Sequence, residues 1–161
     1  MAFKLDTFIP YLMTLSGAKV SEAFAQVYGG QLTNPQWRIV CHLAQAEEGL
    51  TSRQLCDTAM LDKSTASRAI NELEQLDWLT VSACDKDKRA KQVRLSEQGR
   101  LQFDALIPKA LLWQQELLAG FSEQEKALLV DLLRRLELRA ADIKKVHRGF
   151  PGKAAFTFKK K

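Results

Sequence analysis

A group of polar side chains between residues 63 and 71 has the types and the spacing to contact DNA. Its members are Lys63, Ser64, Thr65, Ser67, Arg68 and Asn71. An apolar stripe from Ala66 to Leu76 accompanies them at helical spacing, with Asp62 as the expected cap. The first three lie in the first turn, where free backbone N–H groups favour a phosphate. The last three carry groups that hydrogen-bond to base edges, which predicts a helix that contacts both the backbone and the bases of DNA.

A second polar group lies just beyond, where basic residues are concentrated. Residues 86–94 hold five basic side chains and one acidic side chain, a local net charge of +4. A patch of this kind attracts phosphate in a salt-dependent manner. The acidic residue, Asp87, is suited to hold a neighbouring arginine in an extended pose, because a carboxylate accepts a guanidinium fork. The candidate DNA contacts in this group are Lys86, Lys88, Arg89 and Lys91.

The net charge of the whole chain, +5, does not support DNA binding by itself. Residues 1–146 hold 19 basic and 19 acidic side chains, whereas residues 147–161 hold five basic side chains and no acidic ones. The surplus therefore belongs to the tail, and the charge that matters is the local +4. Two roles stay open for this tail: a disordered solubilising end, or an arm that contacts phosphate or packs on its own dimer.

Helices and one hairpin are expected to position these polar groups. Apolar residues at helical spacing predict helices over about 5–28, 34–48, 52–59, 62–76, 96–118 and 122–146. Capping boxes at Thr33–Gln36, Thr51–Gln54 and Ser122–Glu125 support three of the starts. Pro10 predicts a kink or a late start in the first helix, and Pro108 a kink in the fifth. Two β-prone runs, 78–82 and 91–95, predict a hairpin with a charged tip.

Three short helices followed by a hairpin form the layout of a winged helix-turn-helix. In that layout the third helix enters the major groove, and the hairpin reaches along the backbone or into the minor groove. Both polar groups lie on the elements that would meet DNA. The long terminal helices leave apolar stripes that the small central domain cannot cover, which favours a dimer interface. The predicted fold is mainly α with a small β-hairpin: a winged helix-turn-helix flanked by long dimerisation helices.

Five short motifs, in order and at the right spacing, resemble the MarR family of bacterial transcription regulators. They are Leu32–Val40 (LTNPQWRIV), Leu61–Arg68 (LDKSTASR), Leu73-Glu74, Asp87–Lys91 (DKRAK) and Leu95–Arg100 (LSEQGR). Each motif is weak alone, and the ordered set is specific. The resemblance runs from about residue 30 to residue 105, and the flanking helices fit the same architecture.

The resemblance implies a homodimeric DNA-binding regulator, by default a repressor, that binds a pseudo-palindromic operator. It divides the chain into a dimerisation helix (1–30), a winged helix-turn-helix (31–98), C-terminal dimerisation helices (99–147) and a basic tail (148–161). It makes residues 62–76 the recognition helix and Arg89 the wing-tip arginine that reaches the minor groove. The family's DNA-contacting positions fall on Ser64, Thr65, Ser67 and Arg68.

The chain departs from the family pattern at two positions. The wing usually reads Asp-Arg-Arg and here reads Asp87-Lys88-Arg89, which keeps the charge and loses one guanidinium fork. Asp77 stands after the recognition helix, where glycine is usual. Aspartate tolerates the left-handed backbone conformation at a cost, so a turn at this position is still expected.

The resemblance also implies a small effector, often aromatic or anionic, bound between the dimer lobe and the DNA-binding lobe. The residues expected to line its pocket are Tyr11, Lys19, Trp37, Arg38, His42 and Trp113. An alternative stays open, in which Trp37 and Trp113 are core residues and Arg38 is a surface charge.

Other classes of protein have little support in the sequence. There is no Gly-rich loop, GxSxG or HExxH motif, so neither an enzyme nor a cofactor is expected. Two histidines and three cysteines without a CxxC pair do not predict a metal site. No apolar run is long enough to cross a membrane, and Asp6 and Pro10 do not suit a signal peptide. We therefore expect a cytoplasmic protein that does not enter membranes.

Two alternative functions stay open. Cys41 and Cys56 fall on apolar-patterned helices and are expected in the core. Cys84, at the base of the wing, leaves a redox-responsive regulator as one alternative. The other alternative is a winged-helix module that binds another protein and no specific DNA.

Overall fold

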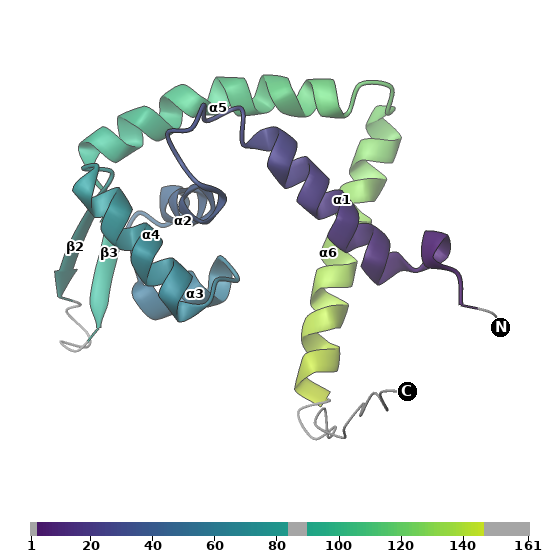
Figure 1. Ribbon diagram of the computed structural model, residues 1–161, viewed down its shortest axis with the longest axis horizontal. Helices are drawn as coiled ribbons and strands as arrows, with labels where there is room; N and C mark the ends of the chain where they lie inside the picture. The colour runs from purple at the N-terminus through teal and green to yellow at the C-terminus, as the bar shows by residue number, and fades with distance from the viewer. Residues whose placement is uncertain (1–2, 84–89, 147–161) are drawn as a thin grey trace, which may run out of the picture. The chain divides into compact units, whose positions relative to one another are not determined.

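The computed structural model describes residues 3–83 and 90–146. A short 3-10 helix, η1 (Leu5–Thr7), comes before α1 (Ile9–Phe24) (Figure 1). The remaining elements are α2 (Asn34–Ala44), β1 (Leu50–Thr51), α3 (Ser52–Thr58), α4 (Lys63–Gln75), β2 (Leu79–Ala83), β3 (Lys91–Leu95), α5 (Glu97–Leu117) and α6 (Glu123–Val146). The chain forms two compact units, Met1–Leu117 and Leu118–Lys161. Within the described ranges, no helix has the length and hydropathy of a membrane span.

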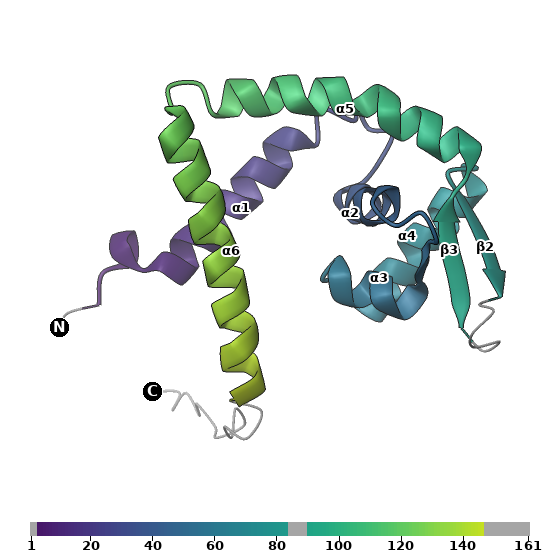
Figure 2. The same cartoon turned by 180° about the vertical axis from the view of Figure 1, so that it is seen from behind.

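The predicted fold class is confirmed: the first unit holds a helical winged-helix arrangement with a small antiparallel sheet. Figures 1 and 2, seen from opposite sides, both show α2, α3, α4 and the strands gathered near the start of α5. The strand order is β1-β3-β2, and β3 pairs with β1 through Leu50↔Val93 and with β2 through Val81↔Val93. The hairpin was predicted, but β1 was not. Two residues are too few to show an alternating pattern, and only pairing with β3 makes them a strand.

The core of the first unit lies where α2, α3, α4 and the sheet meet. Leu43 of α2, Leu55 of α3, Leu73 of α4 and Val93 of β3 are at most 1% exposed. Ala66, Ala69 and Ile70 are also buried, so the predicted apolar stripe of α4 is confirmed up to Leu73. The prediction was wrong for Leu76, which is 53% exposed. The helix ends at Gln75, and the chain turns away before Leu76 reaches the core.

The turn after α4 is fastened to the start of α5. Asp77 has φ 59°, the left-handed conformation expected at the position where the family has glycine. The Ser96 hydroxyl donates to the Asp77 carbonyl, and the Gly99 N–H donates to the Ser96 hydroxyl at 2.8 Å. A Cβ on Gly99 would lie 2.0 Å from the Trp78 carbonyl oxygen, so only glycine fits. Arg100, near the start of α5, also donates to the Ala44 carbonyl at the end of α2 (3.2 Å), which connects α5 to α2.

Helices α5 and α6 keep their predicted bounds to within one residue, whereas α1 ends at Phe24, before the predicted end at residue 28. Pro10 lies in the first turn of α1, so the predicted late start is confirmed. Pro108 lies within α5, which continues as one helix. The third capping box begins α6: the Glu125 N–H donates to the Ser122 hydroxyl at 3.2 Å, and the Glu125 carboxylate accepts from the Ser122 N–H at 2.8 Å.

Candidate nucleic-acid interface

Helix α4 begins with a carboxylate that orders its first turn. Asp62 accepts hydrogen bonds from the Thr65 N–H (2.9 Å), the Thr65 hydroxyl (2.6 Å) and the Ser64 hydroxyl. The hydrogen bonds from Ser64 and Thr65 hold the pKa of the Asp62 carboxyl well below its usual range. The sequence predicts phosphate binding by the free backbone N–H groups of this turn, but the Thr65 N–H is already satisfied by Asp62, and the Ser64 and Thr65 hydroxyls also donate to that carboxylate. Their oxygen lone pairs remain as hydrogen-bond acceptors.

The exposed face of α4 holds the residues predicted to read bases. Ser67, Arg68 and Asn71 are all exposed, while Ala66, Ala69 and Ile70 beside them are buried. Burial of the opposite face therefore fixes the direction in which the polar face points. The geometry suits a helix that enters a major groove with an arginine and an asparagine on the same side.

A buried amide ties α4 to α2. Gln36 is 5% exposed; its side-chain nitrogen donates to the Glu72 carboxylate at 2.9 Å, and its oxygen accepts from the Thr33 N–H at 2.7 Å. The capping box was predicted from the sequence, but the bond to Glu72 was not. A glutamine in a capping box gives no indication of a partner 36 residues away.

A groove of about 400 Å³ separates α4 from the wing. Its lining includes the apolar residues Ile70 and Val81 and the charged residues Arg53, Lys63, Lys91 and Glu74. Ser67 and Asn71 also line it, so the structure brings residues from both predicted polar groups to one groove. Arg53 was not predicted as a site residue. In the sequence it served only as part of the capping box that begins α3.

The described part of the wing supplies one predicted contact, Lys91, which is exposed at the start of β3. The other predicted wing residues lie outside the described ranges: Lys86, Asp87, Lys88 and Arg89, together with Cys84.

The tryptophans expected in the effector pocket belong to an aromatic cluster. Trp37 of α2 packs against Phe24, Tyr28 and Phe103, with ring centroids 5.3 to 5.8 Å apart. Trp113 of α5 packs edge-on against Phe24 at 4.9 Å. The cluster joins α1, α2 and α5, and both tryptophans are half-buried, in keeping with the alternative that they are core residues.

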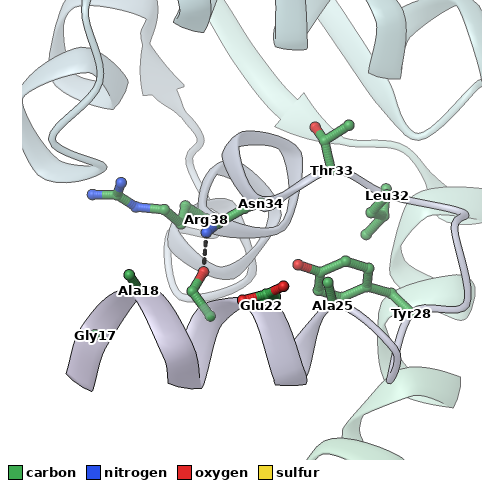
Figure 3. A pocket seen from close by; sticks show the side chains of 10 residues that line it. Gly17, Ala18, Glu22, Ala25, Tyr28, Leu32, Thr33, Asn34 and Arg38 are labelled. Atoms are coloured by element: carbon green, nitrogen blue, oxygen red, sulfur yellow. Dashed lines mark hydrogen bonds between the residues drawn. The ribbon is translucent and has the colours of Figure 1, made fainter. Parts of the chain in front are cut away.

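A pocket of about 690 Å³ lies between α1 and the start of α2 (Figure 3). Of the six residues expected in the effector pocket, only Arg38 lines it. Figure 3 shows Arg38 and the Tyr28 ring at opposite ends, with an Asn34–Ser21 hydrogen bond between them. Burial raises the pKa of the Tyr28 hydroxyl. Tyr11, Lys19 and His42 lie on α1 and α2 outside this lining, and Trp113 lines a separate recess against the end of α1.

The two described cysteines are free and half-buried. Cys41 packs against the core, and burial raises the pKa of its thiol to about 11, which makes it a poor nucleophile at neutral pH. Cys56 lines the groove beside α4. The sequence predicted both cysteines in the core. Cys41 packs against the core cluster, whereas Cys56 lies at the groove.

Comparison with known proteins finds one family whose profile matches the winged-helix part of the chain. The sequence profile of the MarR family matches residues 31–90, which span α2 to the wing. The structure superposes on the PcaV transcriptional regulator of Streptomyces coelicolor, described in complex with its natural ligand, with a TM-score of 0.75. That match has 25% identity and covers 87% of this chain and 99% of PcaV. Residues 31–90 therefore match the MarR family of transcriptional regulators, and the fold is that of MarR-type winged-helix regulators.

Two further relatives are also transcriptional regulators. A probable transcriptional regulator from Pseudomonas aeruginosa is 27% identical, with a TM-score of 0.73, and the match covers 83% of this chain and 99% of that one. The HTH-type transcriptional regulator PecS of Dickeya dadantii (strain 3937) is 27% identical over 92 residues. That alignment covers 57% of this chain and 55% of PecS, about half the length of either protein.

Proposed function

We propose that this protein is a MarR-type, homodimeric, sequence-specific DNA-binding regulator that represses transcription from a pseudo-palindromic operator. The observation that carries the proposal is the polar face of α4, whose Ser67, Arg68 and Asn71 are exposed on a helix fixed by its buried side. Two such helices, one from each protomer, enter successive major grooves about 34 Å apart. In this role the protein acts beside the chromosome, in the cytoplasm.

Phosphate contacts come from basic residues on both sides of this helix. Lys63 and Lys91 line the groove beside α4, and their charges draw the DNA backbone towards it. Arg53, on the same groove, extends this surface to α3. As the family resemblance implies, Arg89 reaches the minor groove. The Asp87 carboxylate is suited to orient it, because a carboxylate accepts a guanidinium fork.

The second protomer covers the apolar stripes of the long helices. Leu128, Leu132 and Leu136 repeat at helical spacing along α6, and each is 40% to 55% exposed. Leu111 and Leu112 of α5 are more than half exposed. Exposed leucines at helical spacing on each helix favour an interface over a solvated face, and a second copy of the chain is the partner that the family architecture offers.

A small aromatic or anionic molecule is the proposed effector, and the pocket between α1 and α2 is its site. Arg38 supplies a positive charge at one end and Tyr28 an aromatic wall at the other, and the Glu22 carboxylate also belongs to the lining. PcaV, which shares the fold along nearly its whole length, has a natural ligand. Binding would favour a dimer in which the spacing of the two recognition helices no longer matches the grooves, and so release the operator.

Replacing Arg68 with alanine tests the base-reading face. We expect operator affinity to fall by roughly 1–3 kcal/mol, about 5- to 150-fold, with weaker discrimination between operator and unrelated duplex. Fluorescence anisotropy with both duplexes measures the two affinities. Lys109→Ala removes the same charge from an exposed position on α5 and serves as the control. Equal operator affinities for the two variants would show that Arg68 does not read the operator.

Replacing Arg89 with alanine tests the wing. Binding should weaken by a similar factor on every duplex, because a contact in the minor groove contributes little to base discrimination. The slope of log affinity against log salt should become shallower by about one unit. A salt titration of parent and variant measures both effects, and an unchanged slope would remove Arg89 from the phosphate-contacting surface.

A further inference from the structure

The two faces of strand β3 have different surroundings. Side chains alternate along a strand, so Lys91, Val93 and Leu95 share one face while Gln92 and Arg94 share the other. Val93 is fully buried, and Lys91 lines the groove beside α4. Gln92 and Arg94 therefore lie on the face of β3 that points away from α4. This position is unexpected for Arg94, whose charge belongs to the local +4 of the wing.

Both side chains on that face bind a single carbonyl. The Gln92 side-chain nitrogen donates to the Glu48 carbonyl at 2.7 Å, and Arg94 Nε donates to the same oxygen at 2.8 Å. The Arg94 guanidinium also lies 3.8 Å from the Glu48 carboxylate. The Arg94 charge is thus directed to the turn between α2 and β1.

The backbone of that turn is shaped to accept these contacts. Gly49 has φ 76°, and a Cβ there would lie 2.4 Å from both the Val93 carbonyl oxygen and Arg94 Cγ. Immediately after it, Leu50 pairs with Val93. Close backbone approach, strand pairing and two side-chain hydrogen bonds all connect the same turn to the same strand.

We propose that Gln92 and Arg94 are positioning residues that clamp β3 to the Glu48 carbonyl and so hold the wing in the orientation that binds DNA. Arg94 acts through the strand and makes no phosphate contact of its own. The DNA-facing charge of the wing is accordingly smaller than its sequence indicates. This inference rests on the proposed DNA-binding function and adds to it the element that fixes the wing.

Three matched variants separate positioning from charge. Arg94→Met and Lys91→Met each remove one positive charge from β3, whereas Gln92→Met removes a donor to Glu48 and no charge. The probe is one fluorescein-labelled duplex of fixed sequence, titrated at several KCl concentrations. Lys91→Met should make the salt slope shallower by about one unit. Arg94→Met and Gln92→Met should each lower affinity about three- to tenfold at every salt concentration and leave the slope unchanged, as expected for the loss of one hydrogen bond.

A double variant and an exchange measurement complete the test. If the clamp acts through β3, Arg94→Met should cost less affinity when Lys91→Met is already present than it does alone. Amide hydrogen exchange of residues 90–95, measured without DNA, should be faster in Arg94→Met and Gln92→Met than in the parent.

The outcomes distinguish this inference from the proposed function. A shallower slope in Arg94→Met, additive effects with Lys91→Met, or parental affinity in Gln92→Met would overturn the clamp while DNA binding stands. A parent protein that binds no duplex would overturn the DNA-binding function and, with it, the role of the clamp in DNA binding. In that event the exchange measurement still tests the clamp. Amide hydrogens of residues 90–95 that exchange no faster in Arg94→Met and Gln92→Met than in the parent would show that no clamp holds β3.

Discussion

A Leu132→Glu variant should lose the dimer and, with it, nearly all operator affinity. Leu132 is 41% exposed on the apolar stripe of α6, where a carboxylate would have to be buried between protomers without a partner. A monomer engages one half-site at a time, so affinity should fall about 10²–10⁴-fold with the loss of bivalent binding. Light scattering after size-exclusion chromatography gives the oligomeric state, and anisotropy gives the operator affinity.

The same helix offers a matched control. Leu138 is 68% exposed and lies off the stripe of Leu128, Leu132 and Leu136, so Leu138→Glu should leave the dimer and its DNA binding intact. Circular dichroism of both variants checks that α6 remains helical. Dimers of unchanged stability in Leu132→Glu would mean that the second protomer does not cover this stripe.

Gly99→Ala should be the most damaging small substitution in the winged-helix unit. The new Cβ would lie 2.0 Å from the Trp78 carbonyl oxygen and 2.8 Å from its carbon, and both are backbone atoms that cannot rotate away. Relief of this clash must separate the start of α5 from the turn after α4. We expect the free energy of unfolding to fall by roughly 3 kcal/mol, at the upper end of the usual overpacking range. Urea denaturation followed by circular dichroism measures this change.

Gly17→Ala provides the comparison. Gly17 lies within α1 with open space around its Cα, so an added methyl group should be neutral or stabilise by about 0.5–1 kcal/mol through helix propensity. If Gly99→Ala and Gly17→Ala were equally stable, the close approach of Gly99 to Trp78 would not exist in solution.

Local chemistry explains why much of the fold was predictable. Thr51 and Ser122 begin helices because each hydroxyl accepts a hydrogen bond from the backbone N–H three residues on. The side chain of that later residue, Gln54 or Glu125, accepts from the backbone N–H of Thr51 or Ser122 in return. The stripe from Ala66 to Leu73 indicated which side of α4 is buried, and so which side leaves Arg68 and Asn71 exposed. These features depend on neighbours within one or two helical turns, which are visible in the sequence.

The features that were missed depend on residues far apart in the chain. Strand β1 exists only through its pairing with β3, and the Gln36–Glu72 and Arg94–Glu48 contacts join segments 36 and 46 residues apart. The expected effector residues stay a prediction, but the pocket between α1 and α2 is lined mainly by small and polar side chains from Gly17 to Asn34, which helical spacing alone does not indicate. Which residues line a cavity follows from how the helices pack.

Selection of bound duplexes from a random pool by the purified protein tests the central claim most directly. The account predicts an enriched inverted repeat with half-site centres about one helical turn, roughly 10 base pairs, apart. It also predicts that affinity for the repeat falls steeply as salt rises, because several phosphates are neutralised. A pool without an inverted repeat, bound with affinity that does not respond to salt, would contradict the account and favour a winged helix that binds another protein.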